Sequence, residues 1–239
     1  MKKLTLAAAL LGCVYSTPGL ATSVSDTFFL TSCHITGSSC NGGFVSQADA
    51  FGNVVLTQSG TNVLVGVNLF NGNRFVETGS GGGNLFDFND AIAGSSITGI
   101  TTTLNGVVTA LSAVGETNVN PGGSPPGFHA DGFGFFTADV HCTNPADCNG
   151  GSTPNINDLH FTVTNISLAQ IEAANTDGIR FVADIFCGGT QSGCTGGLTG
   201  PVDASIASVP GPIVGAGLPG LLGMMGFGGL WWRRKRQVA

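Results

Sequence analysis

The stretch ITTTLNGVVTAL, residues 100–111, carries the clearest local structure signal in the chain. Two segments rich in threonine and branched apolar residues flank Asn105-Gly106. This dipeptide readily adopts the positive φ angles that a tight two-residue hairpin turn requires. Thr and Val favour extended backbone because their branched side chains fit a pleated surface. The stretch therefore predicts two antiparallel strands, and with them a mainly β domain.

The same extended pattern recurs in three further segments. Apolar side chains alternate with other side chains over residues 63–70, 159–164 and 179–186. A period of two is typical of strands with one buried face. A single short helix is expected at residues 167–171, where a Ser-Leu-Ala-Gln sequence resembles a capping box. We therefore expect an antiparallel β-sandwich or jelly-roll-like domain with one short helix.

The first 21 residues have the order of a secretion signal. Two lysines precede an uncharged, mostly apolar stretch at residues 4–12, and Gly19 and Ala21 place small residues before the expected cleavage site. This order is typical of exported proteins, and the apolar stretch is too short to cross a bilayer of about 30 Å. An alternative stays open, because residues 10–13 loosely resemble a lipoprotein box with Cys13 as the lipid-bearing residue.

Residues 213–232 form an uncharged stretch of twenty residues. A helix of this length spans about 30 Å, enough to cross a membrane once. Two aromatic residues lie where an interfacial belt is expected, and four cations follow, so the tail anchor consists of Trp231, Trp232, Arg233, Arg234, Lys235 and Arg236. Such a basic cluster stays on the cytoplasmic side. We therefore expect one ectodomain, residues 22–208, outside the membrane.

The expected ectodomain is strongly acidic. All fourteen Asp and Glu residues of the chain lie within it, against only two cationic side chains, Arg74 and Arg180, which gives a formal charge of −12. Nucleic acids and anionic lipids are bound mainly through Lys and Arg, which neutralise phosphate. The charge therefore argues against nucleic-acid binding.

Six cysteines remain after the expected signal, in three close pairs: Cys33 and Cys40, Cys142 and Cys148, and Cys187 and Cys194. An even number in an exported chain indicates disulfides. Six cysteines allow fifteen connectivities, and the sequence does not select among them. The close pairs favour three local disulfides. The spacings do not match those of a zinc knuckle.

The search for chemical motifs finds no catalytic pattern. There is no nucleophile elbow, zinc-protease pair or phosphate loop, so we expect no enzymatic activity. Two histidines, His129 and His141, each stand two residues from an aspartate and would share a strand face with it. No cofactor is expected unless it is calcium, for which oxygen donors occur in two groups, Asp87, Asn89 and Asp90, and Asn155, Asn157 and Asp158.

Aromatic usage bears on carbohydrate binding. Residues 22–208 contain no Trp and no Tyr but fifteen of the sixteen Phe residues. Sugar rings usually stack on Trp and Tyr, so their absence makes a stacking platform less favoured. Binding through Asp, Asn and calcium stays open.

The tail as a whole resembles a PEP-CTERM sorting signal, which joins a proline-containing motif, a transmembrane helix and a basic cluster. The motif here is Val209-Pro210-Gly211-Pro212, followed by residues 213–232 and 233–236, so residues 209–239 form the signal. Gly211 replaces the name-giving Glu, as in a known VPGP variant. The resemblance implies export, an exosortase-type membrane enzyme as partner and transient anchoring in the inner membrane of a Gram-negative bacterium. It also implies a final place at the cell surface or in the exopolysaccharide and biofilm matrix.

The composition of the tail favours a removable signal over a permanent anchor. Glycine recurs at every third position from Gly217 to Gly226, and Pro219 interrupts the span. Relative to alanine, glycine lowers helix stability by about 1 kcal/mol and proline by about 3 kcal/mol. Small residues also allow close contact with a membrane-embedded enzyme, although a glycine-rich helix that dimerises is the alternative.

Three functions follow in order of preference. The first is an exported, exosortase-processed structural protein of the surface or the exopolysaccharide matrix, without enzymatic activity. The second is a calcium- or glycan-binding adhesive module. The third is a secreted hydrolase of unfamiliar type.

Overall fold

The computed structural model describes residues 23–77, 84–90, 92, 94–104, 107–110, 128–141, 157–189, 191, 193–194, 196–204 and 209–210. Several predicted features lie outside these residues: the signal at 1–21, the turn at 105–106, Cys142, Cys148, Asn155, Gly211, Pro212, the span 213–232 and the cluster 233–236. No helix among the described residues is long and apolar enough to cross a membrane. The described residues all belong to one compact unit, Ser23–Ile213.

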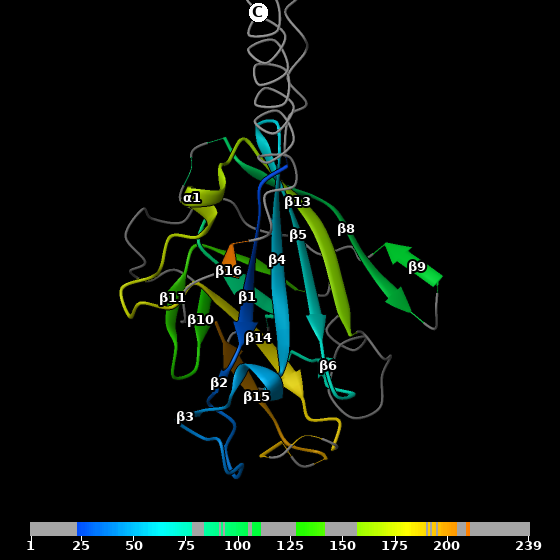
Figure 1. Ribbon diagram of the computed structural model, residues 1–239, viewed down its shortest axis with the longest axis vertical. Helices are drawn as coiled ribbons and strands as arrows, with labels where there is room; N and C mark the ends of the chain where they lie inside the picture. Colours follow the sequence, from blue (N-terminus) through cyan, green and yellow to red (C-terminus); the bar gives the residue numbers. More distant parts are fainter. Residues whose placement is uncertain are drawn as a thin grey trace, which may run out of the picture. The chain divides into compact units, whose positions relative to one another are not determined.

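Sheet A is a seven-stranded antiparallel sheet with the order β16-β1-β4-β5-β13-β8-β9. Figure 1 shows β1, β4, β5, β13 and β8 side by side. Its strands are β1 (Ser25–Leu30), β4 (Gly52–Ser59), β5 (Asn62–Leu69), β8 (Ser96–Leu104), β9 (Val107–Ala110), β13 (Asp158–Thr164) and β16 (Val209–Pro210).

Sheet B is also antiparallel and has the order β12-β7-β14-β15-β2-β3, with β6 paired to β14. Its strands are β2 (Ser32–Cys33), β3 (Gly43–Phe44), β6 (Arg74–Phe75), β7 (Phe86–Phe88), β12 (Ala138–Val140), β14 (Phe181–Phe186) and β15 (Thr199–Asp203). A separate hairpin consists of β10 (Phe128–Ala130) and β11 (Gly134–Phe136). The chain passes repeatedly between the sheets, for example from β1 to β2 and from β13 to β14 (Figure 1).

The hairpin predicted at residues 100–111 is confirmed. Strand β8 pairs with β9, and Leu104 lies opposite Val107 across the two-residue connection. The alternation over residues 63–70 and 159–164 is confirmed as well. Val63, Val65 and Val67 of β5 are buried, whereas Leu64 is 45% exposed. One face of sheet A is therefore apolar and buried, and the other faces solvent.

The main core lies between the two sheets, which pack face to face. The rings of Phe28 in sheet A and Phe181 in sheet B lie 5.0 Å apart in an edge-on arrangement. Phe161 of sheet A lies 6.1 Å from Phe86 and 5.6 Å from Phe88 of sheet B. Such pairs add to the free energy gained by apolar burial. The phenylalanines of the sequence thus form the contact between the layers.

The predicted short helix is present as α1 (Leu168–Ile171). Gln170 accepts a hydrogen bond from the backbone N–H of Ser167 at 2.9 Å, as a capping box requires. The Leu168 N–H donates to the side-chain oxygen of Gln58 on β4 at 2.8 Å, and Ile171 is buried. The helix therefore begins where the sequence predicts and is held by sheet A.

Strand β14 departs from the expected alternation, because both of its faces are buried. Phe181, Ala183 and Ile185 face the main core, but Val182 and Asp184 are buried too. Val182 packs in a second apolar cluster with Ala130, Phe133 and Phe136 of the β10–β11 region. The prediction that one face of this strand is exposed to solvent is therefore wrong, because the β10–β11 hairpin packs on that face.

Candidate binding sites

Two of the three close cysteine pairs form disulfides in the structure. Cys33 bonds to Cys40 and Cys187 bonds to Cys194, with Cα–Cα distances of 5.9 and 5.2 Å. Local pairing is therefore confirmed for these two pairs. The pair Cys142 and Cys148 lies outside the described residues.

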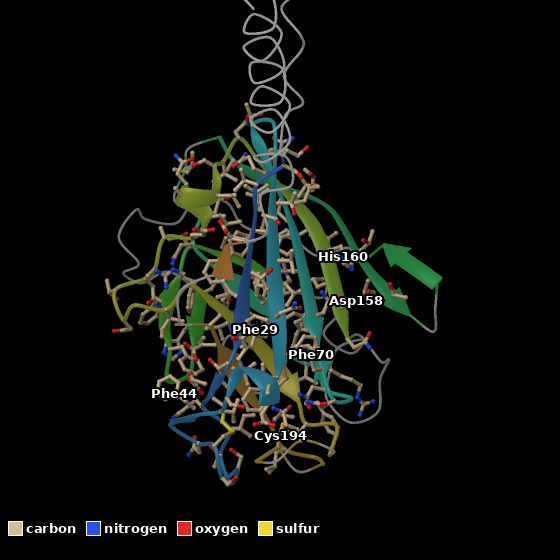
Figure 2. The ribbon with its side chains drawn as sticks, viewed as in Figure 1. Phe29, Phe44, Phe70, Asp158, His160 and Cys194 are labelled. Carbon is tan, nitrogen blue, oxygen red and sulfur yellow. A yellow bond between two sulfur atoms is a disulfide. The ribbon has the colours of Figure 1, made fainter. Side chains whose placement is uncertain are left out.

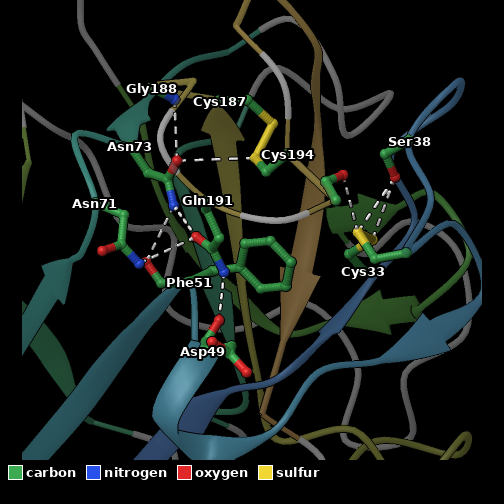
Figure 3. The surroundings of a disulfide bond; sticks show 12 residues. Cys33, Ser38, Asp49, Phe51, Asn71, Asn73, Cys187, Gly188, Gln191 and Cys194 are labelled. Atoms are coloured by element: carbon green, nitrogen blue, oxygen red, sulfur yellow. Dashed lines mark hydrogen bonds between the residues drawn. A yellow bond between two sulfur atoms is a disulfide. The ribbon is translucent and has the colours of Figure 1, made fainter.

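A buried amide network ties the Cys187–Cys194 loop to the rest of the domain (Figure 3). The Asn73 side chain donates to Gln191 Oε1 at 2.8 Å and accepts from the Gly188 N–H at 3.0 Å. Gln191 donates in turn to the backbone carbonyl of Asp49. Sequence reasoning missed this network, because isolated Asn and Gln residues carry no pattern that identifies their partners.

The first predicted group of calcium donors does not converge on one point. Asp87 is 1% exposed and lies on β7. The side-chain nitrogen of Asn89 donates to the Ala173 carbonyl at 3.0 Å, whereas Asp90 Oδ1 accepts from Ser95 Oγ at 2.6 Å. These three residues therefore serve different local contacts.

The second predicted group is only partly described. Asn157 is exposed, and Asp158 begins β13. Asp158 Oδ1 accepts hydrogen bonds from Thr102 Oγ1 at 3.0 Å and from the Thr103 N–H at 2.6 Å. Burial disfavours the charged form of Asp158, but these hydrogen bonds outweigh it and lower its pKa. The described residues contain no group of three or more His, Cys, Asp or Glu side chains arranged to hold a metal ion.

Both predicted His–Asp pairs are in contact. His141 Nδ1 lies 2.6 Å from Asp139 Oδ2, and His129 Nδ1 lies 3.3 Å from Asp131 Oδ1. In each pair the two residues are separated by one position on or next to a strand, so their side chains share a face. The prediction of a shared face is confirmed.

The outer face of sheet B carries an unexpected row of buried carboxylates. Asp139 lies opposite Asp87, Asp87 opposite Val182, and Val182 opposite Asp203. Directly paired residues have side chains on the same face, with Cβ atoms about 4.5–5.5 Å apart. Asp184, two residues beyond Val182, shares this face and is also buried. The sequence did not reveal the row, because its members come from four strands.

This arrangement makes Asp87 hard to ionise. Burial is the largest cause, and the nearby Asp139 and Asp184 carboxylates add to it, so the pKa of Asp87 is raised well above its ordinary value of 3.8. The nearby Asn84 amide opposes the increase. The Oδ1 atom of Asp87 has no hydrogen-bond partner within the described part of the chain. Ionisation of the carboxyl groups in this row therefore destabilises the folded state.

A shallow groove of about 500 Å³ lies on the outer face of sheet A. Gly66 is at its centre, opposite Val55 on β4 and His160 on β13. Because Gly66 has no side chain, the His160 ring lies over it, and a Cβ atom at Gly66 would be 3.3 Å from His160 Nδ1. The flanking row places Leu64 between Thr57 and Thr162. The groove thus combines an apolar floor with hydroxyl, amide and imidazole groups.

One wall of the groove carries a His–Asp pair. His160 Nε2 lies 3.4 Å from Asp158 Oδ2, and Figure 2 shows both residues on β13. Asn68 of β5 lies opposite Asp158, and Asn53 of β4 lies opposite Asn68. This edge therefore offers several hydrogen-bonding groups to a polar ligand.

A smaller pocket of about 230 Å³ lies on the outer face of sheet B. Its lining includes Ser32, Phe44 and Asp203 from the sheet and Phe133 from the β10–β11 turn. Figure 2 shows Phe44 on the opposite side of the view from Asp158 and His160. These two hollows therefore lie on different sheets and differ in chemistry.

The start of the predicted sorting motif forms part of sheet A. Val209 and Pro210 make up β16 and pair with Thr27 and Asp26 of β1. The other motif residues, Gly211 and Pro212, and the tail anchor from Trp231 to Arg236 lie outside the described residues. The folded domain thus extends to the first half of the motif.

No protein-family model matches the chain, and neither a curated protein nor a solved structure matches it.

Proposed function

We propose that the protein is an exported structural component of the cell surface or exopolysaccharide matrix, delivered by an exosortase-type membrane enzyme and without catalytic activity. The observation that carries the proposal is the pairing of Cys33 with Cys40 and of Cys187 with Cys194. Local disulfides of this kind are typical of domains that fold in an oxidising compartment. They agree with the export signal expected at the N-terminus.

The sorting tail supplies the route to the surface in this proposal. Val209 and Pro210 are held in extended backbone as β16, directly before Gly211 and Pro212. An extended segment is the form in which a processing enzyme binds a peptide bond. The domain is thus delivered as a folded unit, and the two facing sheets support the β-sandwich architecture that we propose for it. Its finer jelly-roll connectivity stays a prediction.

Processing in the native host tests this function. We expect the surface fraction to contain protein that lacks residues 231–236 and takes up no alkylating agent before reduction. Deletion of the exosortase should retain the tail in the membrane fraction. Because Val209 and Pro210 also form β16, the motif variant should be Gly211→Ala with Pro212→Ala, and Val209→Ile is the matched control. Dominant surface protein that still carries the tail would contradict the proposal.

A second candidate function is glycan binding in the groove of sheet A. The specific observation is the groove around Gly66, which His160, Asn68 and Thr57 line. Polar groups around an apolar floor suit a neutral or weakly charged polysaccharide, which offers both hydroxyl groups and C–H faces. The exopolysaccharide of the native host is the ligand that this candidate requires.

Filling the hollow tests the second candidate. Gly66→Thr and His160→Ala should each reduce retention of the protein on immobilised host exopolysaccharide, whereas Gln47→Ala, an exposed change outside the groove, should not. Equal retention of all variants would exclude the groove as the binding site. Glycan binding that depends on calcium stays a prediction. A rise in the melting temperature of the protein on addition of calcium is its test.

A further inference from the structure

The smaller pocket has a floor defined by strand register. Asp203 of β15 lies opposite Ser32 of β2, and Ser32 lies opposite Phe44 of β3. The three side chains therefore stand in one row on the outer face of sheet B. Asp203 and Ser32 are buried, whereas Phe44 at the edge of the sheet is 70% exposed. The pocket thus runs from a buried carboxylate to an exposed aromatic ring.

The turn between β10 and β11 forms the facing wall. Gly132 has a φ of +81°, and a Cβ atom at this position would lie 2.5 Å from Cγ of His34. This close approach brings the Phe133 ring into an edge-on contact with His34, with 6.4 Å between the ring centroids. Three aromatic side chains, His34, Phe44 and Phe133, consequently line the pocket.

A second carboxylate lies in the same wall. Asp177 follows Asn175, whose side-chain oxygen accepts a hydrogen bond from the Asp177 N–H at 3.0 Å. The side-chain nitrogen of Asn175 donates to the Phe133 carbonyl at 2.7 Å, so this loop is attached to the β10–β11 turn. Asp177 Oδ2 lies against Gly134, where a Cβ atom would collide with it. The position of Asp177 is therefore built into the fold.

Two carboxyl groups, those of Asp177 and Asp203, line the pocket, and no arginine or lysine does. The expected ectodomain contains only two cationic residues, Arg74 and Arg180. Arg74 lies over the Phe186 ring at 4.6 Å, and the Arg180 Nε atom donates to the Glu172 carbonyl at 3.1 Å. Neither residue lines the pocket. A bound group that complements the pocket is therefore a cation.

We propose that this pocket binds a protonated primary amine. Carboxylates accept the N–H bonds of an ammonium group, and an aromatic face at the rim attracts its charge through the ring quadrupole. The volume of about 230 Å³ is below that of pockets for drug-sized ligands, and it suits the end of an alkylamine or one amino-sugar ring. A hard metal ion fits less well, because calcium requires six to eight oxygen ligands.

The binding geometry assigns separate roles to the lining residues. Asp177 supplies an accessible acceptor at the wall, and the carboxyl group of Asp203 lies buried at the floor. Phe44 covers the ammonium group or the methylene next to it from the edge of the sheet. The inference is independent of how the protein reaches the surface, since it uses only the pocket itself.

Calorimetric titration of the full-length protein in a neutral detergent tests the proposal. The probe is cadaverine, and its di-acetylated form is the neutral control. We expect heat of binding with cadaverine and none with the control. Two further probes distinguish the source of the amine. Stronger binding of Nα-acetyl-lysine amide indicates a lysine of a partner protein, and stronger binding of glucosamine indicates an amino-sugar polymer. Binding of any of the three amines at this pocket supports the proposal.

Variants separate this pocket from general attraction of cations to an acidic protein. Phe44→Ala and Asp177→Asn should each weaken cadaverine binding by about two- to fivefold, the effect of one exposed cation–π or charged contact. Val24→Ala and Asp49→Asn are the matched controls, since they remove an exposed apolar side chain and an exposed carboxylate away from the pocket and from the groove of sheet A. Equal affinity in all four variants, or equal binding of the acetylated compound, would overturn the proposal. Absence of any binding by the three amines would overturn it as well.

Discussion

Replacing Asp87 by asparagine should stabilise the protein at neutral pH. Asp87 is 1% exposed and lies directly opposite Asp139, with Asp184 on the same face of sheet B. Asparagine has nearly the same shape but no charge, and its N–H bonds can be donated to the neighbouring carboxylates. The substitution therefore removes the cost of burying a third negative charge while keeping the packing of β7.

The sign of the effect follows from the direction of the pKa shift. The pKa of Asp87 in the folded state lies well above 3.8, because of burial and the two neighbouring carboxylates. As the pH rises from about 4 towards the folded-state pKa, the unfolded chain loses this proton while the folded chain keeps it. The free energy of unfolding then decreases by about 1.4 kcal/mol per pH unit for one such group. The contribution of the Asp87 proton to the free energy of unfolding is fully present below the unfolded-state pKa. It is lost as the pH rises towards the folded-state pKa.

The asparagine variant lacks this dependence. The difference in free energy of unfolding, variant minus wild type, should be close to zero at about pH 3, where both side chains are neutral. It should then increase by about 1.4 kcal/mol per pH unit until the pH passes the folded-state pKa of Asp87. At neutral pH the variant is consequently the more stable protein.

Urea unfolding followed by far-UV circular dichroism measures this difference. The protein is kept oxidised and in EDTA, and the titration covers about pH 3 to pH 7. Asp158→Asn is the matched control of opposite sign, because the pKa of Asp158 is lowered in the fold. Its loss should destabilise the protein by an amount that grows as the pH rises to about 5 and is constant above that. A pH-independent difference for Asp87→Asn would refute the reasoning. A variant that is destabilised at pH 7 only when calcium is present would instead favour the calcium prediction.

Three further predictions concern stability. Replacing both Cys187 and Cys194 by alanine should lower the free energy of unfolding by about 2–3 kcal/mol, as the loss of a small disulfide loop predicts, and an unchanged urea midpoint would contradict it. Gly132→Ala should lower the melting temperature much more than Gly60→Ala. Both glycines have positive φ, but a Cβ atom at Gly60 would meet nothing within 4 Å, whereas one at Gly132 would collide with the His34 ring; equal losses would contradict that steric explanation. Asn73→Ala leaves the Gly188 N–H without its acceptor and should cost about 1–3 kcal/mol by the same urea assay, and a cost near zero would show that the network is dispensable.

Local patterns explain which parts of the fold the sequence predicted. The hairpin at residues 100–111 depends on a two-residue connection and its immediate neighbours, so the pairing of Leu104 with Val107 follows from the sequence. The buried valines of β5 follow from alternation within one strand. The same holds for the capping box at α1 and for the disulfides whose partners lie seven positions apart. In each case the interacting groups are near neighbours in the chain.

Only the tertiary structure decided how these elements meet. Strand β14 has an alternating sequence, yet both faces are buried, because a hairpin about fifty residues earlier in the chain packs on Val182. Asp87, Asp139 and Asp203 became one row, and Ser32, Phe44 and Asp203 became one pocket floor, through the order and register of sheet B. A strand's own sequence specifies which side chains share a face, but not which strand lies beside it. That choice depends on the packing of the whole core, and it placed the charged and aromatic groups together.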